Sequence, residues 1–241
     1  MEDEKGAHEM QNVIGLIGAM DEEIEFFLER MAYVETVEKA GIVFRVGERH
    51  EKRIIVCKCG VGKVNAAVCT QILIDHFEVN KVLFTGVAGA LHPELGIGDI
   101  VVSTDCMQHD MDVTALGFAK GMIPFAEVSV FAAEPELVEA AFAAAQFLYP
   151  GRVRKGRILS GDQFIANRGK VLELHQEMDG ACVEMEGSAV AQVCALNGIP
   201  FVILRSMSDT ADGSANVNFI EFAKLASERS AAIIERMLQR I

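Results

Sequence analysis

The segment "ACVEMEGSAVAQVCALNGIPFVILRSMS", residues 181–208, carries the pattern of a strand, a helix and a second strand in direct succession. "ACVEME" is predicted as a short strand that enters the helix "GSAVAQVCALNG", which Asn197 and Gly198 would end. "PFVILRSMS" follows as an apolar run of strand length. Strands and helices that alternate in this way are typical of an α/β fold.

The same alternation extends through the rest of the chain. Further strands are predicted in "VIGLIGA", "RIIVCKC", "KVLFTGVAGAL", "GDIVVST" and "VRKGRILS", with a possible hairpin in "IVFRVGERHEKRIIV". Helical spacing of apolar residues occurs in "DEEIEFFLERM", "KVNAAVCTQILIDHF", "PELVEAAFAAAQFL" and the C-terminal segment. We therefore predict an extension at residues 1–12 and a single α/β domain at 13–241, with a central mixed β-sheet flanked by helices.

Composition restricts the classes of partner. The chain has 241 residues, 51% of them hydrophobic, and a formal net charge of −13, which would repel nucleic acid and anionic membrane surfaces. No apolar run approaches the roughly 18 residues of a membrane span, and the acidic start is unlike a signal peptide. We expect a soluble, cytoplasmic protein whose six cysteines are buried, reduced thiols.

Glu184 and Glu186 stand in an otherwise apolar stretch, where ionised carboxylates are rare unless they are paired. If the segment is extended, both glutamates point to one side and Met185 to the other. The two carboxylates would then face one cleft. An ion-paired or solvated strand end is an equally good interpretation of these residues alone.

Other predicted strand ends carry polar or aromatic side chains. Arg205, Ser208 and Asp209 end one strand, Glu23 follows the first strand, and Phe164 follows the polar turn "SGDQ". Each has a simpler explanation as a cap, a turn residue or a core aromatic. Together they exceed what capping requires. Because ligands of α/β folds bind at the carboxyl ends of strands, we expect a ligand site there.

Eight motifs in register give the chain a resemblance to a known family, namely "IGLIGAMDEE", "CGVGKVNAA", "TGVAGAL", "GDIVVS", "HDMDVTALG", "SGDQFI", "VEMEG" and "RSMSD". From Val13 to the C-terminus the chain resembles the 5'-methylthioadenosine/S-adenosylhomocysteine nucleosidases of the nucleoside phosphorylase-like superfamily. The resemblance implies hydrolysis of the N-glycosidic bond between adenine and a 5'-thio-substituted ribose. It implies a homodimer, and nothing in the sequence demands a bound cofactor.

The resemblance also implies roles for the polar residues in an oxocarbenium-like transition state. The residue matching Asp209 donates a proton to adenine N7, and Ser208 orients its carboxyl group. Glu23 matches the general base for the attacking water. Glu184 and Arg205 would help to hold that water.

Substrate-binding residues follow from the same resemblance. Glu186 would accept hydrogen bonds from the ribose hydroxyls and Met185 would pack against the sugar. Phe164 would stack on adenine, and the main chain at Ile165 would bind the edge of the base. The remaining matches are Val87, Ala88 and Gly89 near the sugar, and Met20, Val61, Phe219 and a second subunit's Leu116 around the 5'-thio group.

Two positions depart from the family pattern. Val87 stands where the family often has Ser, and Ala90 replaces a Gly. The loss of one neutral hydrogen bond should weaken transition-state binding by about 1 kcal/mol. The preference among methylthioadenosine, S-adenosylhomocysteine, 5'-deoxyadenosine and aminofutalosine stays open.

Four alternatives compete with this prediction. A phosphorylase of the same fold needs cationic groups for phosphate, whereas "GAMDEE" supplies acids. A dinucleotide-dependent oxidoreductase needs G-x-G-x-x-G, which "GLIGAM" lacks. A nucleoside-binding protein without catalysis would need no acid and base. For a metal, the only dense candidate is His109, Asp110 and Asp112, which we instead expect in a loop near the site or a dimer contact.

Overall fold

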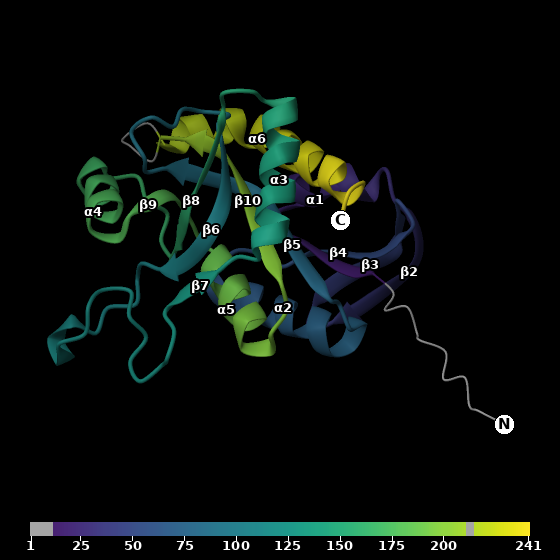
Figure 1. Cartoon of the computed structure of the whole chain (residues 1–241), viewed down its shortest axis with the longest axis horizontal. Helices are drawn as coiled ribbons and strands as arrows, with labels where there is room; N and C mark the ends of the chain where they lie inside the picture. Colours follow the sequence, from purple (N-terminus) through teal and green to yellow (C-terminus); the bar gives the residue numbers. More distant parts are fainter. Residues whose placement is uncertain (1–11, 211–214) are drawn as a thin grey trace.

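A mixed ten-stranded β-sheet forms the centre of the fold in residues 12–210 and 215–241, which the computed structural model describes (Figure 1). Its strands are β1 (Val13–Gly18), β2 (Ala32–Lys39), β3 (Ile42–Arg49), β4 (Lys52–Lys58), β5 (Lys81–Ala90), β6 (Ile100–Gln108), β7 (Val130–Ala132), β8 (Val153–Ser160), β9 (Gly180–Glu184) and β10 (Phe201–Asp209). The predicted mixed sheet is confirmed. The predicted extension lies outside the described residues except for Asn12.

The strand order is β10-β6-β8-β9-β5-β1-β4-β3-β2, and β7 pairs with β6. β10 also pairs in parallel with β5, so that β10, β6, β8, β9 and β5 close on themselves. Every residue of β1 and β10, and all of β5 except Lys81, is buried. These strands therefore form the buried centre of the sheet.

Helices cover both faces of the sheet (Figure 1). On one face α6 (Ala215–Leu238) packs on β10 and β5 and contacts α1 (Asp21–Leu28) and α3 (Pro135–Leu148). On the other, α2 (Lys63–Phe77) packs against α5 (Gly187–Asn197). The polar helix α4 (Arg168–Met178) lies beside β9.

The strand–helix–strand prediction for residues 181–208 is confirmed in β9, α5 and β10. α5 ends at Gly198, whose φ of 66° lies in the left-handed region that glycine adopts without steric strain. The strand predicted at residues 181–186 is two residues too long, because β9 ends at Glu184 and Glu186 is already the N-cap of α5. This early end changes where the next side chains point.

A long connection, residues 109–129, joins β6 to β7 and projects from the body of the molecule (Figure 1). We call it the arm. It contains the short 3-10 helix η1 (Thr114–Leu116) and exposes the large apolar side chains Leu116, Met122, Phe125 and Val128. The sequence predicted none of β2, β7 and α4.

All six cysteines are buried and free of disulfides, as predicted. No helix in the described part of the chain is long and apolar enough to cross a membrane.

Candidate active site

One cavity of about 310 Å³ collects most of the predicted site residues. It opens beyond the carboxyl ends of several strands, as the fold class predicts. The predicted residues that line it are Glu23, Glu184, Ser208, Asp209, Glu186, Met185, Phe164, Ile165, Met20, Val61, Val87, Ala88 and Gly89. Met20 and Asp209, which are 189 positions apart in the sequence, thus line the same cavity.

Glu23 projects from the first turn of α1 into the cavity and is 3% exposed. Its Oε2 accepts hydrogen bonds from the main-chain N–H groups of Ala19 at 2.6 Å and Met20 at 3.1 Å, and its Oε1 from Val87 N–H at 3.1 Å. Burial raises the pKa of Glu23, against the opposing effects of Arg205 and these N–H groups. A carboxylate of raised basicity is suited to accept a proton.

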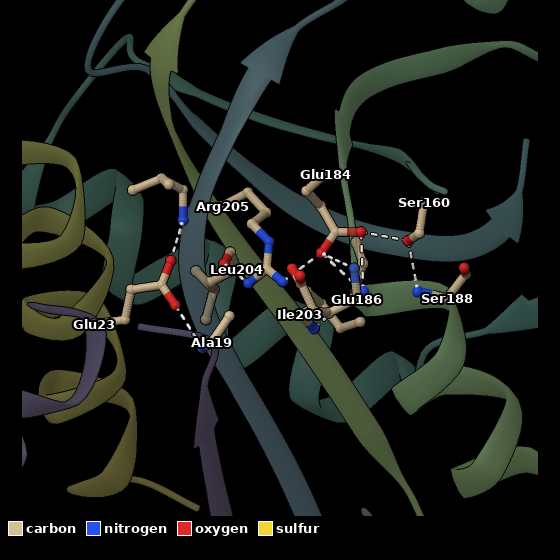
Figure 2. Close-up of polar contacts among 12 residues, drawn as sticks. Ala19, Glu23, Ser160, Glu184, Glu186, Ser188, Ile203, Leu204 and Arg205 are labelled. Atoms are coloured by element: carbon tan, nitrogen blue, oxygen red, sulfur yellow. Dashed lines mark hydrogen bonds and ion pairs between the residues drawn. The ribbon is translucent and has the colours of Figure 1, made fainter. Parts of the chain in front are cut away.

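Arg205 and Glu184 form a buried ion pair (Figure 2). Arg205 Nη2 donates to Glu184 Oε2 at 2.6 Å, and the guanidinium lies 4.0 Å from the centre of the Phe84 ring. Glu184 also accepts from Gly187 N–H at 2.9 and 2.8 Å and from the Ser160 hydroxyl. Because Arg205 is 1% exposed, it can act on a ligand only through its neighbours or its charge.

The close approach of Glu23 and Arg205 requires a glycine at position 86. A Cβ atom there would lie 2.7 Å from Glu23 Oε1 and 2.8 Å from Arg205 Nη1. Figure 2 shows Arg205 between Glu23 and Glu184. The carboxylates of both glutamates therefore balance one buried guanidinium.

Glu186 is 6% exposed, and its Oε1 accepts from Gly62 N–H at 2.8 Å. Burial and the neighbouring charge of Glu184 raise the pKa of Glu186 to about 8. Glu186 and Glu184 both face the cavity, as predicted, but Met185 lines it too. The predicted alternation was wrong because the strand ends at Glu184.

Asp209, the last residue of β10, is 2% exposed and lines the cavity beside Ser208. Ser208 Oγ lies 2.9 Å from Asp209 Oδ2 and 3.4 Å from the carbonyl oxygen of Ala88. A hydroxyl has one proton to donate, so it bonds one of these acceptors at a time. The shorter contact is the one to Asp209.

Apolar side chains form the rest of the wall. Met20, Ile165 and Val87 lie inside, whereas Val61 and Phe164 are 53% and 49% exposed at the mouth. A half-exposed aromatic beside a cavity offers a flat surface for a ring.

Three cavity residues escaped prediction from the sequence, namely Ala19, Gln163 and Val183. Each adjoins a predicted site residue, and Gln163 lies within the motif "SGDQFI". Their position next to predicted site residues was therefore the signal that could have identified them. Two predicted residues are not in the wall: Arg205 lies behind it, and Leu116 is 72% exposed on the arm. The side chain of Phe219 lies outside the described residues.

Among the residues that the structure describes, no group of three or more His, Cys, Asp or Glu is arranged to hold a metal ion. Asp110 instead forms an ion pair with Lys63, with 2.6 Å between Oδ1 and Nζ. His109 is buried against Gly161, beside the site.

The fold and this cavity define a class of proteins. A model of the phosphorylase superfamily matches residues 13–239. Nucleosidases of 5'-methylthioadenosine and S-adenosylhomocysteine from Bacillus pumilus and a Marinomonas species are 39% and 41% identical to the chain. These alignments cover 94% and 95% of this chain and 98% and 99% of the relatives. The chain belongs to the phosphorylase superfamily and, within it, to the family of the 5'-methylthioadenosine/S-adenosylhomocysteine nucleosidases, and it is an enzyme.

Solved structures agree with this assignment. The Neisseria meningitidis nucleosidase in complex with methylthio-immucillin-A matches with a TM-score of 0.92 and 38% identity, over 95% of this chain and all of that one. A futalosine hydrolase of Helicobacter pylori matches with a TM-score of 0.92 and 37% identity, over 98% of this chain and all of that one. The resemblance found in the sequence is therefore confirmed.

Proposed function

We propose that the enzyme hydrolyses the N-glycosidic bond of 5'-methylthioadenosine and S-adenosylhomocysteine, releasing adenine and a 5'-thio-substituted ribose. The observation that carries the proposal is that Glu23 and Asp209 line the same cavity. An acid and a base in one enclosed space are what hydrolysis of a glycosidic bond requires. The relatives named above support the choice of substrate.

In the proposed reaction the bond from C1' to the adenine nitrogen breaks, and its electron pair goes to the base. Asp209 donates a proton to adenine N7, with Ser208 fixing the orientation of the carboxyl group. Water attacks C1' and its proton passes to Glu23. The ribosyl group is cationic in the transition state, and the surrounding carboxylates stabilise that charge.

Arg205, which lies behind the wall, and Glu184, which lines the cavity, support this chemistry. Glu184 holds the guanidinium at 2.6 Å, and the charge of Arg205 opposes the rise in the pKa of Glu23. The pair thus helps to hold the water through Glu23. Without Arg205, burial alone would keep Glu23 protonated at higher pH, and it would be a poorer base at neutral pH.

Substrate binding divides between polar and apolar groups. Glu186 accepts hydrogen bonds from the ribose hydroxyls, and Met185 packs against the sugar. Phe164 stacks on adenine, and the main chain at Ile165 binds the base edge. Val87 N–H is occupied by Glu23, so the side chains of Val87 and Ala88, next to Gly89, give the sugar an apolar wall.

The 5'-thio group would lie against Met20 and Val61, joined by Phe219 and by Leu116 of a second copy. Leu116 is exposed on the arm together with Phe125, which is 94% exposed. Large apolar side chains exposed on one projecting segment are typical of an interface. We propose a homodimer in which each arm reaches the other site. Sedimentation equilibrium should give twice the mass of 26.2 kDa.

Water is the proposed nucleophile because none of the described residues that line the cavity is a lysine, arginine or histidine. Phosphate would need such a group. Adenine release from methylthioadenosine and S-adenosylhomocysteine should therefore proceed in phosphate-free buffer. Activity that depends strictly on phosphate would overturn the hydrolase proposal. The likeness to a futalosine hydrolase places aminofutalosine in the same substrate panel.

The acid is tested by Asp209→Asn, which keeps the size of the side chain but removes its acidic proton. We expect adenine release to fall at least about a thousandfold, while a transition-state-like inhibitor or the substrate still binds. Calorimetric binding and adenine release are measured on the same preparation. Unchanged turnover would exclude Asp209 from the proposed role.

A further inference from the structure

Three segments that surround the cavity are joined by a closed ring of hydrogen bonds. Asp110, at the base of the arm, accepts from Lys63 Nζ at 2.6 Å through Oδ1 and from Asp162 N–H at 3.0 Å through Oδ2. Asp162 Oδ1 in turn accepts from Lys63 N–H at 2.8 Å. We call Lys63, Asp110 and Asp162 the clasp.

The clasp lies next to the proposed ribose site. Lys63 begins α2, and the preceding residue, Gly62, donates its N–H to Glu186 Oε1 at 2.8 Å. The side chains of Lys63 and Asp110 are only 18% and 15% exposed, so solvent screens their attraction less than that of a surface pair. The position of Gly62, and with it that of the Glu186 carboxylate, therefore depends on the clasp.

We propose that Lys63 and Asp110 are positioning residues whose ion pair fixes Glu186 for ribose binding and ties that glutamate to the base of the arm. The inference rests on the proposed function, since it assigns Glu186 to the ribose. We expect no effect on adenine binding, because the loop of residues 161–165, although bonded to the clasp at Asp162 N–H, keeps a second main-chain anchor, a bond from Gly161 N–H to the carbonyl oxygen of Glu184 at 3.2 Å. The arm is proposed to contact a second subunit. The clasp connects this arm to the site through hydrogen bonds.

Asp110 is the clasp residue that accepts hydrogen bonds with both of its carboxylate oxygens. Burial raises the pKa of Asp110, but the bonds from Lys63 and Asp162 outweigh burial and lower it, so the group is ionised at neutral pH. An asparagine has one acceptor oxygen, and its NH₂ group cannot accept from the second donor. Asp162 accepts a single bond in the described structure, and an asparagine can still accept it.

This difference supplies a matched pair of variants, Asp110→Asn and Asp162→Asn, which make the same chemical change in the same ring. We expect Asp110→Asn to raise KM for methylthioadenosine about tenfold with kcat within about threefold of wild type, since one charge-assisted hydrogen bond is lost. Asp162→Asn should change KM less than about twofold. Lys63→Met should behave like Asp110→Asn, and Lys63→Arg should restore the wild-type KM.

Adenine lacks the ribose, so its inhibition constant as a competitive inhibitor does not depend on Glu186. This constant therefore distinguishes a misplaced Glu186 from a general loosening of the site. The inhibition constant of adenine should be the same in wild type and Asp110→Asn. An equal rise in KM and in the adenine constant, or equal effects of the two asparagine variants, would overturn the proposal. If Asp110→Asn does not fold by circular dichroism, Lys63→Met is judged by the same criteria. Wild-type adenine release tests the proposed function separately.

Discussion

Glu184→Gln tests the buried ion pair of Arg205 and Glu184. The side chains of Arg205 and Glu184 are 2% and 3% exposed, and their closest atoms lie 2.6 Å apart. Glutamine has nearly the same shape, so it leaves no cavity. It removes the negative charge and leaves the guanidinium with Glu23 and Glu186 as its acidic neighbours. The variant therefore isolates the charge of the pair from its packing.

The expected loss follows from this burial. Removing one partner of a buried pair leaves an uncompensated charge, which lowers the free energy of unfolding by about 3–5 kcal/mol. Since Glu23 still neutralises part of the Arg205 charge, we expect about 3 kcal/mol, at the lower end of that range. Urea unfolding followed by circular dichroism measures the change through the transition midpoint at constant slope.

Glu29→Gln is the matched control. Glu29 pairs with Arg30, but these side chains are 61% and 42% exposed, so we expect a loss of about 0.5 kcal/mol or less. A loss below about 1 kcal/mol for Glu184→Gln would refute the reasoning, because a pair this deeply buried would then behave like a surface pair. The same variant should lower the pKa of Glu186, which the charge of Glu184 raises.

Two further predictions concern the groups around this pair. Gly86→Ala should lower adenine release about a hundredfold, because the new methyl group displaces Glu23 and Arg205 from their present positions. In the control Gly96→Ala the nearest atom is 3.8 Å from the added carbon, so activity should be retained, and equal activities would contradict the role of Glu23. The raised pKa of Glu186 should make the free energy of unfolding fall as pH rises from about 4.5 to about 8. Glu186→Gln should flatten this part of the stability profile, and an unchanged profile would show that Glu186 is not the group that titrates.

Much of the fold was predictable because its signals are local. Buried parallel strands have continuous apolar runs, and Pro135 and Gly198 mark a helix start and a helix end by backbone conformation alone. The location of the site followed from the same predictions, since side chains just after strand ends meet at one edge of the sheet. Glu23 and Asp209 were found in this way.

Other features depend on contacts that no local pattern contains. The side chain of Arg205 points inward because it pairs with Glu184, 21 residues away in the sequence. Asp110 bonds to Lys63 and Asp162, which are 47 and 52 residues away. The orientation of Met185 was mispredicted because the strand ends two residues earlier than its composition suggested. α4 buries only Leu174 and Met178, which is too weak an amphipathic signal to identify a helix.

The main chain of β5 positions both proposed catalytic groups, Glu23 and Asp209. Its main chain bonds Glu23 at Val87, and Asp209 stands opposite Gly89 in the neighbouring strand, just after a bulge in β10. The two reference points are thus separated by two residues, about 6.6 Å of extended backbone. Peptide geometry, rather than side-chain packing, sets this spacing. Substitutions at Val87 and Ala88 can consequently adapt the cavity to other nucleosides without changing the separation between the proton donor Asp209 and the proton acceptor Glu23.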